Sequence, residues 1–160
     1  MFDPPMWKAF QRYKALDSEA RKLFWQATIL LAVAAVSLRL RGFRGTKESL
    51  QRKLARQRSE PSRPGGQEAA LEMTCRMVKA GAQYGLGHPT CLEQSLVLWY
   101  LLQSRRIPAR FRIGVRKAAG KFEAHAWVEY EGTRLNQAEE LHQHYVAFEG
   151  DLSDLPEELV

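Results

Sequence analysis

The chain changes its hydrophobic period abruptly, and this change constrains the fold more than any other feature of the sequence. Residues Leu96–Leu102 are apolar or aromatic throughout, which is typical of a helix surrounded by other elements. After Ile107-Pro108, apolar residues alternate with polar ones over Ala109–Arg116 and again over Phe122–Tyr130, the period of half-buried strands. Glu131-Gly132 favours a turn into a third short strand. A helix followed by an antiparallel meander predicts an α+β fold.

Composition divides the 160 residues into three parts. Residues 1–58 are predicted to form a helical N-terminal extension, in which Asp17 or Ser18 caps a helix. Residues 59–66 (SEPSRPGG) are predicted to be a linker, because prolines and glycines cannot continue a helix. Residues 67–160 hold predicted helices over 67–82 and 91–104, the two long strands, and a third strand over 133–136.

The N-terminal part contains an uncharged run from Leu23 to Leu38. Its 16 residues fall short of the roughly 20 that a membrane-spanning helix needs. Two interpretations are open. The run is either a buried core helix or a helix lying at the membrane interface, next to the basic stretch that follows.

The net charge of +6 is concentrated in one stretch, Arg39–Arg63, which contains nine Lys or Arg residues and two acidic residues. Such a block can bind nucleic acid, an acidic membrane or an acidic peptide. We expect no nucleic-acid partner, because aromatic residues do not interleave the charges. With only two cysteines, and no secretory signal at Met1–Phe10, the expected location is cytoplasmic, membrane association through the N-terminal helix being the alternative.

Cys91 is the first candidate for chemistry. Thr90 and Glu93 fit a capping box, which places Cys91 at the first position of a helix. The positive end of the helix dipole favours a thiolate there, and the first-turn N–H groups can hold an oxyanion. The alternative is a small buried cysteine that only packs.

His125 is the second candidate, since it lies between Ala124 and Ala126 on a predicted strand beside the central helix. The small neighbours leave room for the helix end to approach. A cysteine at a helix N-terminus that faces a strand histidine is the arrangement of papain-like nucleophilic catalysis.

A third group is expected to orient the imidazole from the next strand. Asn136 and Gln137 are the candidates there, and Glu139 or Glu140 are the alternatives further along.

Four further residues are candidate substrate-binding groups. His88 and Thr90 lie close to Cys91 in the sequence, and Trp127 and Glu129 share the His125 face of their strand. A solvated loop and a core aromatic are the ordinary alternatives for these positions.

The remaining reactive side chains predict no further site. Cys75 has apolar neighbours at helical spacing and is expected to pack in the core. His142 and His144 have no accompanying zinc spacing, and no phosphate-binding glycine motif occurs. We therefore expect neither a metal nor a cofactor.

Taken together, these residues resemble a known family. The resemblance is carried by Thr90–Leu96 with Leu101-Leu102, then Arg106–Ala109, Ile113–Arg116, Ala124–Glu129 and Gly132. This spaced set closely resembles the transglutaminase-like cysteine proteases of lasso-peptide biosynthesis, and it covers about residues 87–148. The resemblance implies a papain/transglutaminase-like fold, in which a central helix packs on a small antiparallel sheet.

The same resemblance implies roles and partners. Cys91 matches the nucleophile and His125 the base, while many relatives have an aspartate about where Gln137 stands here. Either Asn136 or Gln137 substitutes, a nearby glutamate takes the place, or activity is weak or lost. The implied partners are a precursor peptide, a separate leader-recognition protein and an asparagine-synthetase-like cyclase.

The expected function is therefore that of a cysteine peptidase that removes the leader from a ribosomally made lasso-peptide precursor through a Cys–His thioester mechanism. Two alternatives stay open at this point. One is an acyltransferase or transglutaminase on the same fold, and the other is a non-catalytic module that binds the precursor.

Overall fold

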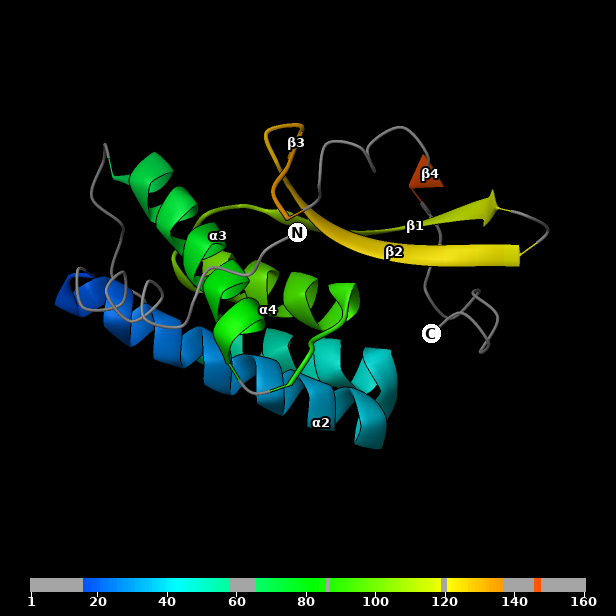
Figure 1. The fold of residues 1–160 in the computed structure, drawn as a ribbon, viewed down its shortest axis with the longest axis horizontal. Helices are drawn as coiled ribbons and strands as arrows, with labels where there is room; N and C mark the ends of the chain where they lie inside the picture. Colours follow the sequence, from blue (N-terminus) through cyan, green and yellow to red (C-terminus); the bar gives the residue numbers. More distant parts are fainter. Residues whose placement is uncertain (1–15, 58–65, 86, 119–120, 137–145, 148–160) are drawn as a thin grey trace.

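A computed structural model describes residues 16–57, 66–85, 87–118, 121–136 and 146–147. The helices gather on one side of a small antiparallel sheet, so the α+β prediction is confirmed (Figure 1). In chain order the elements are α2 (Ser18–Arg56), α3 (Gln67–Tyr84), α4 (Cys91–Ser104), β1 (Arg110–Ala118), β2 (Lys121–Tyr130), β3 (Thr133–Arg134) and β4 (Val146–Ala147).

Helix α2 is two helical halves joined at a sharp reversal. Asp17 caps its start, where the side chain accepts a 2.7 Å hydrogen bond from the Ala20 N–H. Gly42 has φ 66° and ψ −177°, a conformation essentially confined to glycine. The chain doubles back there, and the Ser37 and Thr46 hydroxyls meet across the turn at 2.9 Å (Figure 1). The sequence predicts the helix but not this reversal.

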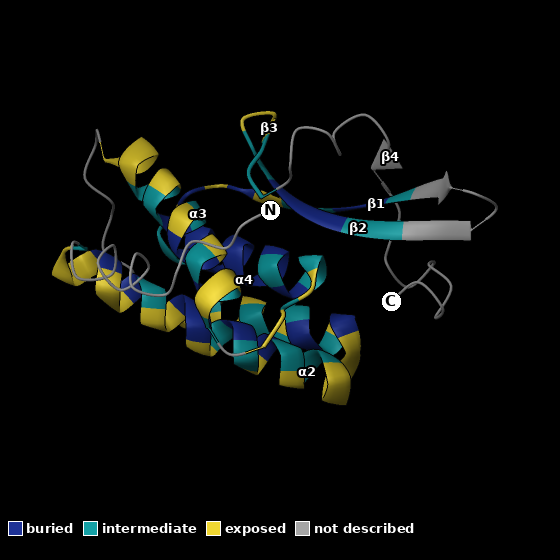
Figure 2. Ribbon diagram, viewed as in Figure 1, coloured by how far each residue is buried: buried dark blue, intermediate teal, exposed yellow. Residues whose placement is uncertain are grey.

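One apolar core joins the three helices. Every residue of α4 from Leu96 to Leu102 is buried, which confirms that this helix is the central one. The core includes Leu31 from the first half of α2 and Met77 from α3. Figure 2 shows that the buried residues of α2 lie on the side that faces α3 and α4, while its outer side is exposed. The uncharged run is therefore a helix that is buried in the core on one face and exposed on the other.

The domain boundaries predicted from composition stay a prediction. Residues 1–15 and 58–65, which include nearly all of the expected linker, lie outside the described residues. Helix α2 packs in the same core as α3 and α4.

The sheet has the strand order β3-β2-β1-β4, and every pairing is antiparallel. In the register, Ile113 is opposite Ala126 and Gly114 is opposite His125. Ile113 and Ala126 pack with Leu96 of α4, so that face of the sheet lies on the helices. His125 is on the other face, as the period-two alternation predicts.

Two details of the sheet differ from the sequence predictions. Strand β3 is shorter than the expected 133–136, because Asn136 contacts β2 through its side chain rather than through its backbone. Strand β4 was not predicted at all. It pairs Val146 and Ala147 with β1, and two residues are too few to show an alternating pattern.

Candidate active site

Cys91 is the first residue of α4, as predicted. The predicted capping box is present: the Thr90 hydroxyl accepts from the Glu93 N–H at 3.3 Å, and a Glu93 carboxylate oxygen accepts from the Thr90 N–H at 2.6 Å. Cys91 is partly exposed, not enclosed in the interior. Its thiol therefore lies at the positive end of the helix dipole and within reach of a substrate.

The loop before Cys91 is tied to the helix. The side-chain amide of Gln94 donates to the Pro89 carbonyl at 2.8 Å. His88 and Thr90 are exposed in this loop. Both can be reached from solvent beside Cys91, and their predicted substrate contact stays a prediction.

A buried serine joins α4 to β2. Ser95 is fully buried, and its hydroxyl donates to the Ala126 carbonyl at 2.9 Å. Ser95 lies one helical turn after Cys91, and Ala126 directly follows His125. Cys91 and His125 thus lie one helical turn and one residue away from the two ends of this hydrogen bond. Because His125 projects from the face of the sheet opposite to the one that packs on α4, the expected contact between the Cys91 sulfur and the imidazole stays a prediction.

Asn136 completes this connection. Its Nδ2 donates to the Ser95 hydroxyl at 2.7 Å, and its Oδ1 accepts from the Val128 N–H at 2.9 Å. Since the Leu135 N–H also donates to the Val128 carbonyl, the chain leaving β3 is held along the edge of β2. We call Ser95, Asn136 and their two partners on β2 the edge network. The orienting role predicted for Asn136 stays a prediction, and Gln137, Glu139 and Glu140 lie outside the described residues.

The His125 ring is half-buried, and its Nε2 atom is shielded from solvent. The ring stacks on that of Trp127, with centroids 6.3 Å apart and planes inclined by 18°. Gly114, opposite His125 on β1, contributes no side chain beside the imidazole. The imidazole therefore lies nearly parallel to the ring of Trp127.

Trp127 and Glu129 extend this stack along β2. Trp127 is fully buried, and its Nε1 donates to a Glu129 carboxylate oxygen at 2.8 Å. The Arg134 guanidinium lies 4.4 Å from the Trp127 ring centroid, and Arg112 Nε lies 3.2 Å from the other Glu129 oxygen. These contacts support the His125 side of the sheet. The substrate-binding role predicted for Trp127 and Glu129 stays a prediction.

Sequence patterns did not single out Ser95, Arg112 or Arg134. For Ser95 a signal existed: it is a hydroxyl residue in an otherwise apolar stretch, four positions after Cys91. Arg112 carried no signal, because arginines alternate along β1 as ordinary surface residues would. Arg134 carried none because it is one arginine in a strand of two residues.

Cys75 differs from Cys91 in its surroundings. Burial raises the pKa of the Cys75 thiol from 9.0 to about 11, and the charge of Glu72 acts in the same direction. The side chain packs against the core of the helices, as expected from its helical spacing.

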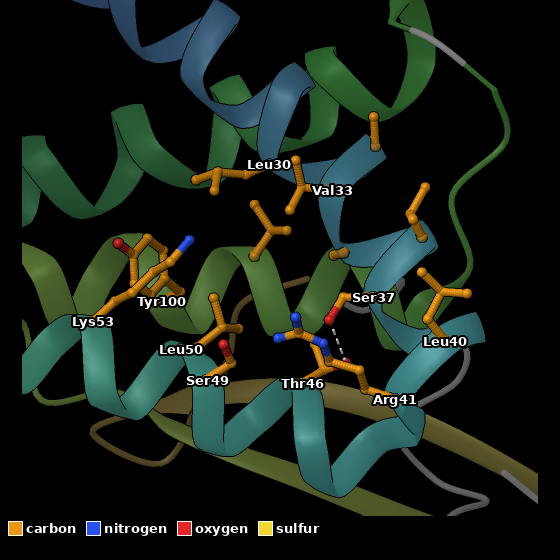
Figure 3. A pocket seen from close by; sticks show the side chains of 14 residues that line it. Leu30, Val33, Ser37, Leu40, Arg41, Thr46, Ser49, Leu50, Lys53 and Tyr100 are labelled. Atoms are coloured by element: carbon orange, nitrogen blue, oxygen red, sulfur yellow. Dashed lines mark hydrogen bonds between the residues drawn. The ribbon is translucent and has the colours of Figure 1, made fainter.

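A separate hollow of about 610 Å³ lies between the two halves of α2 and α4 (Figure 3). Its lining is mostly apolar and includes Leu30, Leu50 and Tyr100, with Arg41 and Lys53 as its cations. Neither Cys91 nor His125 lines this hollow, so it is distinct from the candidate active site.

No group of three or more His, Cys, Asp or Glu side chains that could hold a metal ion occurs within the part of the chain that the structure describes. His142 and His144 lie outside it.

Comparison with known proteins gives one family. No curated protein and no solved structure matches the chain. The family model of the transglutaminase-like superfamily matches residues 30–149, from within α2 to beyond β4. This match spans the Cys91 helix, the His125 strand and the edge network between them. The chain therefore belongs to the transglutaminase-like superfamily.

Proposed function

We propose that this protein is a cysteine peptidase that removes the leader from a ribosomally made lasso-peptide precursor. The superfamily commonly has cysteine peptidase or transglutaminase activity. The observation that carries the proposal is the hydrogen bond from Ser95 to Ala126, because it holds the helix that begins at Cys91 against the strand that carries His125.

In the proposed reaction, His125 takes the Cys91 proton and the sulfur attacks the carbonyl carbon of the scissile peptide bond. The first-turn N–H groups of α4 stabilise the resulting oxyanion. As the C–N bond breaks, the imidazolium gives its proton to the leaving amine and a thioester remains. Water, deprotonated by His125, then hydrolyses the thioester and restores the thiol.

Asn136 and Gln137 are the two residues proposed to orient the His125 imidazole. Asn136 already spans the Ser95 hydroxyl and the Val128 N–H, so it lies beside the proposed pair. Gln137 stands where many relatives have an aspartate. An amide can orient an imidazole, but it stabilises an imidazolium less than a carboxylate does.

The substrate assignment rests on the resemblance of the motifs around Cys91 and His125 to leader peptidases. The same resemblance supports two proposed partners, a separate leader-recognition protein and an asparagine-synthetase-like cyclase.

The test is cleavage of a leader–core precursor, followed by mass spectrometry, with the leader-recognition protein present. Wild type should give a free leader carboxylate and a free core amine, while Cys91→Ala and His125→Ala should each lose product by at least about 10³-fold. Cys75→Ala is the matched control and should cleave normally. Circular dichroism should show that all variants are folded.

Three results would contradict the proposal. Cleavage by purified Cys91→Ala would remove the proposed nucleophile. A product in which the acyl group is joined to an added amine, with no free acid, would indicate acyl transfer instead. Precursor binding without turnover in the complete mixture would indicate a binding module.

A further inference from the structure

The outer face of the first half of α2 carries an exposed apolar stripe. It comprises Ile29, Val33, Val36 and Leu40, which are 59%, 50%, 55% and 78% exposed. Their spacing of four, three and four residues places them on one side of the helix. Trp25, 54% exposed, extends the stripe toward the N-terminus. From Trp25 to Leu40 the stripe is about 22 Å long.

Positive charge brackets the stripe. Arg21 and Lys22 precede it, Arg39 and Arg41 lie at its other end, and all four are exposed. No acidic residue occurs between Glu19 and Glu48 in the sequence. An exposed apolar helix face with cations at both ends matches the chemistry of an anionic lipid surface, where acyl chains meet negatively charged head groups.

The hollow between the halves of α2 continues this surface. Val33, Val36 and Leu40 belong both to the stripe and to the lining of the hollow, and Arg41 and Lys53 line it as well (Figure 3). The apolar surface is therefore wider than a single helix face, and its cations lie beside it.

The same helix is long and apolar enough to cross a membrane by length and composition alone. Its packing favours a different arrangement. Ala20, Leu23, Ala27, Leu31 and Ala34 are buried in the core that α2 shares with α3 and α4. Crossing the bilayer would expose that core, whereas lying in the interface engages only the outer stripe.

We propose that the protein binds anionic membrane surfaces with the first half of α2 lying in the plane of the interface, the apolar stripe inserted and the flanking cations on lipid phosphates. This proposal is independent of the peptidase proposal. Neither Cys91 nor His125 belongs to the stripe or lines the hollow beside it.

The test is co-sedimentation of the full chain with phosphatidylcholine vesicles made with and without phosphatidylglycerol. The protein should bind the vesicles that contain phosphatidylglycerol, and binding should fall as salt is added. Ile29→Asp and Val36→Asp should each weaken binding by about tenfold or more, because a carboxylate resists insertion. Gln83→Asp, at an exposed position of α3, is the matched control and should bind as wild type does.

Binding should be unchanged in Cys91→Ala, which separates this test from the peptidase test. Failure to bind the anionic vesicles, or equal binding by the stripe variants, would overturn the proposal. A dimer in solution that Ile29→Asp dissociates, without vesicle binding, would assign the stripe to a second copy of the chain. An acidic leader peptide that binds wild type but not Ile29→Asp, again without vesicle binding, would assign it to the peptide.

Discussion

The two cysteines occupy environments that predict opposite reactivity. Cys91 is partly exposed at the start of α4, where it can be reached by a reagent in solution. Cys75 packs against the core, and burial raises the pKa of its thiol to about 11. An increase of two units lowers the thiolate fraction of Cys75 at neutral pH by about 100-fold.

Brief treatment with iodoacetamide at neutral pH should therefore modify Cys91 well before Cys75. Peptide mapping by mass spectrometry measures this, with Cys91→Ala and Cys75→Ala as paired controls. The rate at Cys75 should rise as the pH approaches about 11. Equal rates at neutral pH would contradict the assignment of Cys91 as the reactive thiol.

The same pKa affects stability with a definite sign. Folding raises the pKa of Cys75 above its ordinary value of 9.0, so the folded state favours the neutral thiol. This contribution to the free energy of unfolding is complete below pH 9.0 and is lost as the pH rises through about 11.

The position of a single residue could be predicted where the residues that determine it are close together in the sequence. The capping box that places Cys91 lies within four consecutive residues and was predicted correctly. The hydrogen bond between Asn136 and Ser95 joins residues 41 positions apart, and no local pattern indicates it. Whether Asn136 or another group orients His125 depends on such distant contacts, which composition and periodicity cannot reveal.

At the scale of elements, the edge network determines how α4 meets β2. The Ser95 hydroxyl bonds both the Ala126 carbonyl and the Asn136 amide inside the protein. Ser95→Ala leaves both groups without that partner and should lower the free energy of unfolding by about 1–3 kcal/mol. Chemical denaturation followed by circular dichroism measures the loss.

The matched control for this change is Ser104→Ala, at the other end of the same helix. Its hydroxyl donates to the Leu101 carbonyl of its own helix at 2.8 Å, so the cost should be about 0.5 kcal/mol or less. If the proposed peptidase activity is correct, Ser95→Ala should also slow precursor cleavage by about 10²-fold at a temperature where it is folded. Equal effects of the two variants would contradict the role of the edge network.

The elements were predictable where their periodicity was strong. The bounds of α4 and the presence of the two long strands follow from an apolar run and a clear alternation. The reversal at Gly42 was missed, because a single glycine within a helical composition does not show whether the helix continues through it.

At the scale of the whole molecule, α2 shares one apolar core with α3 and α4. Leu31 is buried in the core shared with α3 and α4, while Ile29, two residues earlier, is exposed. Leu31→Ala should lower the free energy of unfolding by about 2–5 kcal/mol. Ile29→Ala, the control on the same helix, should change it by about 0.5 kcal/mol or less. Thermal and urea denaturation would test the difference, and a similar small effect at both positions would contradict the shared core.

The two apolar faces of α2 also have a consequence while the chain is being synthesised. This helix leaves the ribosome before α3 and α4, so the core around Leu31 is complete only once Leu102 is made, roughly 70 residues later. At ordinary elongation rates this interval lasts several seconds. During that time the nascent chain presents hydrophobic surface on both sides of one helix, and this is the period in which a chaperone or a nearby bilayer would protect it from aggregation.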